Sequence, residues 1–238
     1  MEIKKAVIVA AGLSSRLYPL TLERPKGLLP VGGKSLLERS IGILRKNGIE
    51  DIAVVVGYKK EMIMEALDSS ITYIPNPFYK HCNNLGSLWF ARNFVHNDPI
   101  VYMHGDIIYD EKIFSQTFQS FLKRKDDIEL VTDFTRHDEE SMKVRITKEN
   151  YLIESSKEIP LDKAAGEWTG ITYIRNSEAV FKYFSKVLFE EGLNHYDTKA
   201  FSEMAADGYK IYCSSTMELP WTEIDFIDDY EKAKSLFL

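Results

Sequence analysis

Cysteine is scarce in this sequence of 238 residues, where Cys82 and Cys213 are the only two and lie far apart. Two separated cysteines provide neither a cluster of zinc ligands nor a disulfide framework. The N-terminal segment 1–5 leads directly into an apolar run, without the long apolar region and cleavage site of a signal peptide. We therefore expect a reduced, cytoplasmic location.

Long hydrophobic runs and an excess of positive charge are also missing. No apolar run approaches the roughly 20 residues that span a bilayer, so we expect no membrane partner. The 30 Lys and Arg residues are outnumbered by 36 Asp and Glu residues, which gives a formal net charge of −6 at pH 7. Proteins that bind nucleic acids or anionic lipids carry a basic footprint that this composition does not provide. Any phosphate must therefore be bound by a local cluster of cations.

The chain also lacks internal repeats, low-complexity tracts and linkers rich in Pro, Gly or Ser. Its apolar fraction of 45% and charged fraction of 28% are ordinary for a globular protein. The length is sufficient for one sizeable α/β domain. We interpret residues 1–238 as a single domain.

Uninterrupted apolar runs alternate with amphipathic segments along the chain. Residues 6–10 and 52–56 carry no polar side chain, which is typical of strands that are buried on both faces. Between these runs, the apolar spacing of residues 34–47 predicts a helix. A strand, a helix and a second strand in this order imply a parallel sheet. The sequence thus predicts an α/β fold with a Rossmann-like, mixed and mainly parallel sheet flanked by helices.

The rest of the chain continues this alternation. Two short strands, over 142–147 and 151–155, are separated by turn residues and predict a small hairpin beside the sheet. Periodicity predicts further strands over 71–74, 99–106, 128–134, 166–174 and 209–213. It predicts further helices over 60–67, from 83 or 84 to about 93, and over 111–125, 177–189 and 198–206.

The most informative stretch is the loop after the first strand. Small residues in such a loop let backbone N–H groups approach a phosphate closely, and fixed cations neutralise its charge. The spacing fits neither a P-loop nor a dinucleotide-binding fingerprint, and a plain Gly-Ser turn is the alternative. The candidate phosphate-binding residues are Ala10, Ala11, Gly12, Ser14, Ser15, Arg16 and Lys26.

The spacing of this loop resembles the signature of the sugar-nucleotidyltransferase-like family, roughly G-x-G-x-R followed by a proline and then P-K. Gly12, Arg16, Pro25 and Lys26 match the signature, whereas its second glycine is Ser14 in this chain. The resemblance covers nearly the whole chain. It implies that the small loop residues bind a nucleotide, and that Arg16 and Lys26 grip its phosphates as the catalytic residues.

A second nucleotide-binding segment is expected at residues 83–88. Its pattern N-N-x-x-S-L resembles the phosphocholine cytidylyltransferase branch of the family. The resemblance implies that Asn84 and Ser87 face the nucleotide, together with Gly57 at the end of the second strand. Asn83 or Asn84 could instead be only the N-cap of the helix that begins here.

Two aspartates are candidate metal ligands. Asp106 follows an apolar strand, and ligands bind at the carboxyl ends of such strands, although a turn or N-cap role is the alternative. His104 is expected to pack or to form a hydrogen bond, not to act as a catalyst. Near the C-terminus, alternation places Glu223 and Asp225 on one side, and the resemblance maps Asp225 onto the family's second metal-binding aspartate. Oxygen ligands of this kind suit Mg²⁺.

The binding site for the second substrate, the acceptor, is expected near this C-terminal segment. A pocket of aromatic and acidic side chains suits a quaternary or primary ammonium group, through cation–π contact and ion pairing. Of the two tryptophans considered for this pocket, Trp168 and Trp221, at least one could equally be an ordinary core residue. The candidate acceptor-binding residues are Glu167, Trp168, Gly170, Tyr173, Trp221 and Glu223.

The resemblance to bacterial cytidylyltransferases, together with these features, implies a Mg²⁺-dependent transfer of a cytidylyl group. An acceptor such as phosphocholine or 2-aminoethylphosphonate would attack the α-phosphorus of CTP and release pyrophosphate. Lys26 would hold the α-phosphate and the attacking phosphate, and Arg16 the leaving pyrophosphate. The alternatives are a hexose-1-phosphate nucleotidyltransferase that uses UTP, dTTP or GTP, and a non-catalytic nucleotide-binding protein of the same fold. Nothing in the sequence indicates the oligomeric state.

Overall fold

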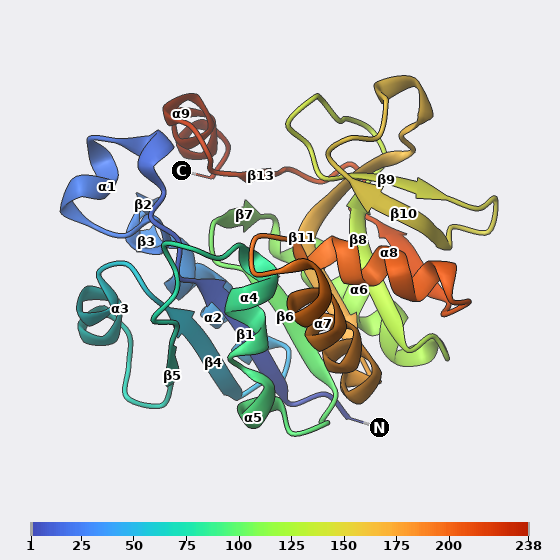
Figure 1. Cartoon of the computed structure of the whole chain (residues 1–238). Coiled ribbons are helices and arrows are strands. Elements are labelled where there is room, and N and C mark those ends of the chain that lie inside the picture. Colours follow the sequence, from blue (N-terminus) through green and yellow to red (C-terminus); the bar gives the residue numbers. More distant parts are fainter. Residues whose placement is uncertain (1, 238) are drawn as a thin grey trace.

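The computed structural model describes residues 2–237, which form a mixed sheet flanked by helices (Figure 1). Within these residues the main sheet has nine strands, in the order β10-β9-β11-β6-β1-β4-β5, with β8 paired to β11 and β12 paired to β8. The neighbours β6, β1, β4 and β5 run parallel, whereas β11 is antiparallel to β6 and β8. The predicted fold class is confirmed. The strands are β1 (Lys5–Ala10), β4 (Asp51–Val56), β5 (Thr72–Pro75), β6 (Ile100–His104), β8 (Ile128–Asp133), β9 (Lys143–Ile146), β10 (Leu152–Ser156), β11 (Gly166–Ile174) and β12 (Ile211–Ser215).

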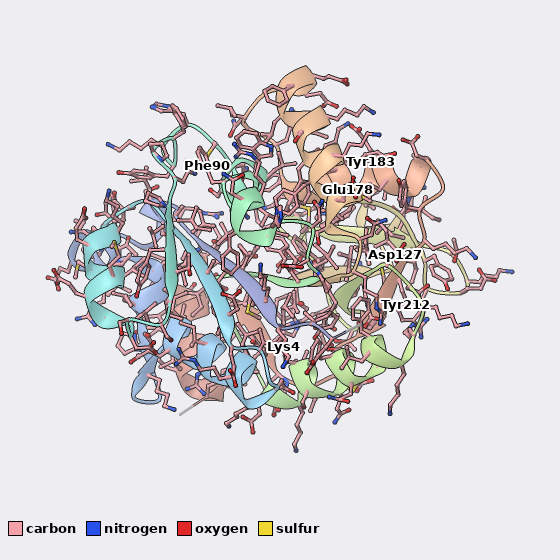
Figure 2. All side chains as sticks on the ribbon, turned by 90° about the horizontal axis from the view of Figure 1, so that it is seen from below. Lys4, Phe90, Asp127, Glu178, Tyr183 and Tyr212 are labelled. Atoms are coloured by element: carbon pink, nitrogen blue, oxygen red, sulfur yellow. The ribbon has the colours of Figure 1, made fainter. Side chains whose placement is uncertain are left out.

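Helices cover both faces of the sheet because the buried strands are apolar on both sides. Along β1, Ala6 and Ile8 join one core cluster, and Val7 and Val9 join the other. Figure 2 looks at the sheet from below and shows α6 and α7 on opposite sides of it. The first cluster includes residues of α2 (Leu36–Lys46), α3 (Lys60–Ala66) and α6 (Glu111–Lys123); the second includes residues of α4 (Asn84–Trp89), α5 (Arg92–Val95), α7 (Ser177–Glu191) and α8 (Asp197–Ala206).

The C-terminal segment returns to the centre of the molecule. Strand β13 (Trp221–Glu223) pairs antiparallel with β7 (Ile107–Tyr109), which directly follows β6 (Figure 1). The final helix, α9 (Ile227–Leu236), then packs beside the segment 15–35 through the hydroxyl of Tyr230, which donates to the carbonyl oxygen of Pro30 at 2.7 Å. That segment contains η1 (Ser15–Leu17), α1 (Leu20–Glu23), η2 (Lys26–Leu28), β2 (Pro30–Val31) and β3 (Lys34–Ser35). The pairing of β7 with β13 and the packing of α9 therefore bring the C-terminal segment beside the end of β6 and beside the segment 15–35.

Some predicted boundaries are corrected by local hydrogen bonding. The helix predicted from residue 34 begins at Leu36, because Ser35 and Glu38 form a reciprocal capping box. The helix predicted to run to about residue 93 is divided into α4 and α5, and the strand predicted to reach Asp106 ends at His104. The predicted hairpin is confirmed as β9 and β10. Within residues 2–237, no helix combines the length and the apolar character required to cross a membrane.

A buried glutamate in β8 gives the fold a pH-dependent stability. Glu129 is fully buried, and its closest cation, Arg124, lies 3.9 Å away. Burial raises the pKa of Glu129 from 4.5 to about 7. Between pH 4.5 and about 7, Glu129 is protonated in the folded state but ionised in the unfolded state. The contribution of Glu129 to stability is therefore full below about pH 4.5 and is lost as the pH rises through about 7.

We expect Glu129→Gln to remove this pH dependence. At pH 8 the free energy of unfolding should rise by about 1–3 kcal/mol relative to the unmodified chain, because a neutral amide replaces a buried charge. At pH 4.5 the two proteins should differ much less. Urea unfolding at both pH values measures the difference, and an equal effect at both would contradict the assignment of Glu129.

Candidate active site

An open cleft of about 320 Å³ lies at the carboxyl ends of β1 and β6. In Figure 1 the loop after β1, the start of α4 and the segment after β13 surround this region. Its walls come from segments that are far apart in the sequence. The lining residues are Gly12, Ser14, Ser15, Arg16, Lys26, Asn83, Asn84, His104, Asp106, Met142, Lys157, Trp168, Gly170, Tyr196, Glu223 and Asp225.

Two cations and two carboxylates meet in the cleft. The ammonium group of Lys26 lies 3.0 Å from Oδ2 of Asp106 and 2.8 Å from Oδ1 of Asp225. The guanidinium of Arg16 lies 2.6 Å from Oδ2 of Asp225. The backbone N–H of Ile224 donates to the carbonyl oxygen of Asp106 at 3.0 Å, which fixes the C-terminal segment against the end of β6. The structure thus brings all four predicted catalytic and metal-binding residues together.

The loop conformation explains why the family signature has a second glycine. Ser14 occupies that position and adopts the left-handed conformation, with φ 53°, which glycine adopts at lower cost than other residues. Its carbonyl oxygen accepts a hydrogen bond from the hydroxyl of Thr21 at 2.8 Å, which holds the turn. The turn leads directly into η1, which carries Arg16. The departure from the signature therefore leaves the backbone turn in place.

Charge coupling between these groups is strong because the cleft is partly buried. Burial disfavours the charged form of Lys26, but the carboxylates of Asp106 and Asp225 outweigh it and raise the Lys26 pKa above its usual value. Burial opposes ionisation of Asp225 as well, yet Lys26 and Arg16 hold its pKa below the usual range. For Glu223 the balance is reversed: burial, followed by the charges of Asp106 and Asp225, outweighs Lys26 and His104 and raises its pKa to about 8.

The donor set in this cleft fits a hard divalent cation. Ligand atoms of Asp106 and Glu223 lie within 4.8 Å of each other and of an imidazole nitrogen of His104, and the carboxylate of Asp225 shares the Lys26 ammonium with Asp106. Oδ1 of Asp106 is buried without a hydrogen-bond partner among the described residues, so it retains an acceptor that a cation could use. Carboxylate oxygens at this density suit Mg²⁺.

His104 belongs to a buried polar network beneath the cleft. Its Nε2 lies 3.0 Å from Oδ2 of Asp197 and 3.3 Å from Nδ2 of Asn84, and the hydroxyl of Tyr102 donates to the same Asp197 oxygen. Burial opposes protonation of His104, but Asp197 outweighs it and raises the pKa to about 9. The prediction that His104 forms a hydrogen bond is confirmed. The network links α8 to Asn84 at the start of α4.

Trp168 and Gly170 form one side of the cleft, against His104. The Trp168 ring meets the imidazole edge to face, with centroids 4.9 Å apart. Gly170 has φ +83°, and a Cβ there would lie 3.0 Å from Cγ of His104, so a side chain would displace the imidazole. The β11–β8 register shifts between Trp168 and Thr172, so β11 has a bulge at this glycine.

A second hollow, of about 250 Å³, adjoins the cleft and shares Glu223 and Asp225 with it. Its walls combine the segment 136–141, which follows β8, with the start of α9. Trp221 is nearly covered here, since its ring lies under Arg136 and its indole N–H donates to Asp133 at 2.8 Å. We name this space the side hollow; it is lined by Arg136, His137, Asp138, Glu140, Ser141, Glu167, Trp221, Thr222, Glu223, Asp225, Phe226, Asp229 and Lys232.

Residues 5–237 match the model of a protein family described as Nucleotidyl transferase. The chain belongs to this family. A CTP:phosphoglutamine cytidylyltransferase from Campylobacter jejuni is 26% identical over 256 residues, which cover 95% of this chain and 97% of the relative. A CMP-5'-(3-aminopropyl)phosphonate synthase from Streptomyces rubellomurinus is 26% identical over 248 residues, which cover 98% of this chain but only 38% of that longer relative.

Solved structures of nucleotidyltransferases share the fold over nearly the whole chain. The CTP:phosphocholine cytidylyltransferase of Streptococcus pneumoniae has a TM-score of 0.80 and 23% identity, and the match covers 98% of this chain and 99% of that one. A UDP-glucose pyrophosphorylase has a TM-score of 0.82 and 16% identity, with 98% of both chains covered. At these identities the likeness establishes the nucleotide-diphospho-sugar transferase fold.

Several residues assigned from the sequence of this nucleotidyltransferase lie outside the cleft. Tyr173 lines neither cavity, which corrects its assignment: it is fully buried, and its ring packs against Phe114 while its hydroxyl lies 2.7 Å from Oγ1 of Thr117. Ser87 is also turned away, since its hydroxyl accepts a hydrogen bond from Nδ2 of Asn76 at 3.0 Å.

Three predicted nucleotide-binding residues, Ala10, Ala11 and Gly57, make close contacts that pack the loop after β1. The carbonyl oxygen of Ala11 accepts the N–H of Tyr58 at 3.0 Å. A Cβ on Gly57 would lie 2.6 Å from that same oxygen, so the close approach of the two strand ends requires glycine. Ala10 lies under Gly105, where an added Cβ would lie 2.8 Å from the Ala10 Cβ. Their contact with a nucleotide stays a prediction.

The structure adds residues to the nucleotidyltransferase cleft that the sequence did not indicate. Lys157 directly follows β10 and lies 3.5 Å from Glu140, with its ammonium group 5.7 Å from the ring centroid of Tyr196. Tyr196, the N-cap residue of α8, lines the cleft, and Asp197, the first residue of α8, is buried beneath it. None of the three lies in a recognisable motif. Strand pairing brings Lys157 to the cleft, and the packing of α8 brings Tyr196 and Asp197 there.

Proposed function

We propose that this nucleotidyltransferase transfers the cytidylyl group of CTP to the phosphate or phosphonate of a small molecule such as phosphocholine or 2-aminoethylphosphonate. The observation that carries the proposal is the convergence of Arg16 and Lys26 with Asp106 and Asp225 in one cleft. The Campylobacter and Streptomyces relatives, whose names specify CTP or CMP, favour a cytidine nucleotide.

The proposed reaction is an in-line substitution at phosphorus. An acceptor phosphate oxygen attacks the α-phosphorus, and the bond from that phosphorus to the bridging oxygen of the β-phosphate breaks, so pyrophosphate leaves. The nucleophile is already an anion, and no general base is needed. We assign Lys26 to the α-phosphate and the attacking phosphate oxygen, and Arg16 to the departing pyrophosphate. Their contribution is alignment and neutralisation of charge.

The carboxylates at the centre of the cleft are assigned to the metal. Asp106 and Asp225 would hold Mg²⁺, which when bound supplies neutralisation of the phosphate charge. In the structure both carboxylates are engaged by Lys26, and Asp225 also by Arg16. Binding of a cation to the carboxylates would therefore release both basic side chains toward the phosphates.

The acceptor is proposed to carry an ammonium group. Glu223, shared by the cleft and the side hollow, and Glu167 in the side hollow are largely buried acids, and burial raises the Glu167 pKa to about 7. A cationic group brought beside them would recover the cost of burying their charge. Trp168 and Trp221 are each only 3% exposed, so ion pairing rather than an open aromatic cage is the main proposed contact.

The proposal is tested by pyrophosphate release with Mg²⁺, with each of CTP, UTP, dTTP and GTP offered against phosphocholine, 2-aminoethylphosphonate and several hexose 1-phosphates. The expected result is release only when CTP and an amine-bearing acceptor are both present. Release with a hexose 1-phosphate and another nucleotide would overturn the substrate assignment but preserve the reaction. Nucleotide binding without release in any combination would favour a non-catalytic protein.

Lys157 is proposed to bind the acceptor's phosphate, because it is a cation on the wall formed by β10, outside the loop that carries Arg16 and Lys26. We expect Lys157→Met to raise the KM for the acceptor roughly 10–100-fold, the loss typical of one charge-assisted hydrogen bond. The KM for CTP should change much less. Steady-state kinetics with each substrate varied in turn provide the measurement.

The exposed Lys163 lies six residues further along the chain and outside both cavities. Lys163→Met should leave both KM values unchanged and serves as the matched control. Equal increases in the two KM values for Lys157→Met would contradict the proposed contact.

A further inference from the structure

Lys143 is a fully buried lysine to which the proposed reaction assigns no role. It is the first residue of β9, and none of its surface is exposed. Its ammonium group donates to the backbone carbonyl oxygens of Asp138, at 3.1 Å, and Glu139, at 3.0 Å. Burying an ammonium group against neutral carbonyls is costly compared with burying an apolar side chain of similar length. The presence of a lysine at this position is therefore not explained by packing of the core alone.

The two carbonyl groups belong to the loop over residues 134–142, which connects β8 to β9. Inside this loop the carboxylate of Asp138 accepts hydrogen bonds from the backbone N–H groups of Glu140, at 2.9 Å, and Ser141, at 3.0 Å. These bonds close a compact turn. Lys143 fixes that turn to the start of β9.

The other end of the 134–142 loop is also fixed by a buried charge. Asp133, the last residue of β8, accepts hydrogen bonds from Nε of Arg136 at 3.2 Å and from the indole N–H of Trp221 at 2.8 Å. Thus one end of the loop is tied to the C-terminal segment and the other to Lys143. A loop without regular secondary structure is in this way held by specific polar contacts at both ends.

This loop contributes to both substrate spaces. Its residues from Arg136 to Ser141 form one wall of the side hollow, and Met142 lines the main cleft. In the strand register, Lys143 lies between Ser156 of β10 and Glu167 of β11. Ser156 directly precedes Lys157. Lys143 is therefore the point where the loop, the strand leading to Lys157 and the strand carrying Glu167 are joined.

We propose that Lys143 is a positioning residue that holds the 134–142 loop in the conformation that recognises the acceptor. It acts through the backbone of Asp138 and Glu139 and does not touch either substrate. This inference rests on the proposed function, because that function assigns the side hollow to the acceptor. It predicts that the charge of Lys143 serves acceptor affinity and not folding.

The experiment compares Lys143→Met with the unmodified protein. Methionine keeps the length of the side chain but removes the donors, so the protein should fold and melt at an equal or higher temperature. Hydrogen–deuterium exchange of peptides from residues 134–142 should become faster in the substrate-free variant. The KM for the acceptor should rise roughly 10-fold or more, whereas kcat and the KM for CTP should stay within about twofold.

Lys148 provides the matched control, because it is an exposed lysine at the opposite end of the same hairpin. Lys148→Met should alter neither exchange in the loop nor any kinetic constant. Unchanged exchange of residues 134–142 in Lys143→Met would overturn the positioning role, and so would parallel increases in the KM values for CTP and the acceptor.

The exchange measurement needs no substrate, which separates this inference from the proposed function. If the unmodified protein turned over none of the offered acceptors, the proposed function would fail. Faster loop exchange in Lys143→Met would still support the role of Lys143 in holding the loop, and unchanged exchange would still refute it.

Discussion

Lys26→Met is expected to lower the rate of pyrophosphate release by about 10²–10³-fold, the loss typical when one preorganised donor to a developing charge is removed. The Lys26 ammonium lies within 3.0 Å of both Asp106 and Asp225. No other described cation contacts both carboxylates, so a neighbour cannot replace it. The main loss should appear in kcat, because Lys26 neutralises the charge on the α-phosphate oxygens as the anionic acceptor attacks, and this contact is strongest in the transition state.

The control for this variant is Lys34→Met. Lys34 is an exposed lysine in β3, eight residues further along the chain and outside the cleft. Both variants should show the far-UV circular dichroism of the unmodified protein, and only Lys26→Met should lose activity. Turnover within about threefold of normal in Lys26→Met would refute its catalytic assignment.

Asp225→Asn is expected to have two opposite effects. Turnover at saturating Mg²⁺ should fall about 10²-fold, since one proposed metal ligand loses its charge. CTP binding in EDTA should instead become tighter than in the unmodified protein. The reason is that Arg16 and Lys26, which Asp225 holds at 2.6 Å and 2.8 Å, become available to the phosphates.

Isothermal titration calorimetry with and without Mg²⁺ measures both binding effects. Asp229→Asn is a useful comparison, because Asp229 accepts the backbone N–H groups of Asp225 and Phe226 and lies outside the main cleft. That variant should not tighten CTP binding in EDTA. Weaker metal-free binding in Asp225→Asn would show that Asp225 does not restrain the two cations.

The sequence predicts the sheet and the charged cluster in the cleft well, because both depend largely on local patterns. Runs such as 6–10 and 52–56 are apolar throughout, and strands of this kind can only be central. Arg16 and Lys26 follow from the spacing of one loop, and Asp106 from its place after a buried strand. In the structure Arg16 and Lys26 contact Asp225, which the family resemblance supplied, and Lys26 also contacts Asp106.

The residues proposed to bind the acceptor were harder to predict, because their positions depend on distant pairings. Strand alternation alone does not reveal which face of β11 meets the cleft, and Tyr173 consequently proved to lie in the apolar core with Phe114. Lys157 reaches the cleft only because β10 pairs with β9, which pairs with β11. The burial of Lys143 follows from the same pairings, and an isolated lysine in a strand pattern gives no sign of it.

The most direct test of the central claim is ³¹P NMR of a reaction containing the protein, CTP, Mg²⁺ and 2-aminoethylphosphonate. Attack at the α-phosphorus predicts equal amounts of pyrophosphate and of a product in which the phosphonate phosphorus is coupled to the phosphorus of CMP. CDP with orthophosphate would show that the bond to the γ-phosphate is cleaved, and CMP without a coupled product would show that water attacks the α-phosphorus. Either result would contradict cytidylyl transfer to the acceptor.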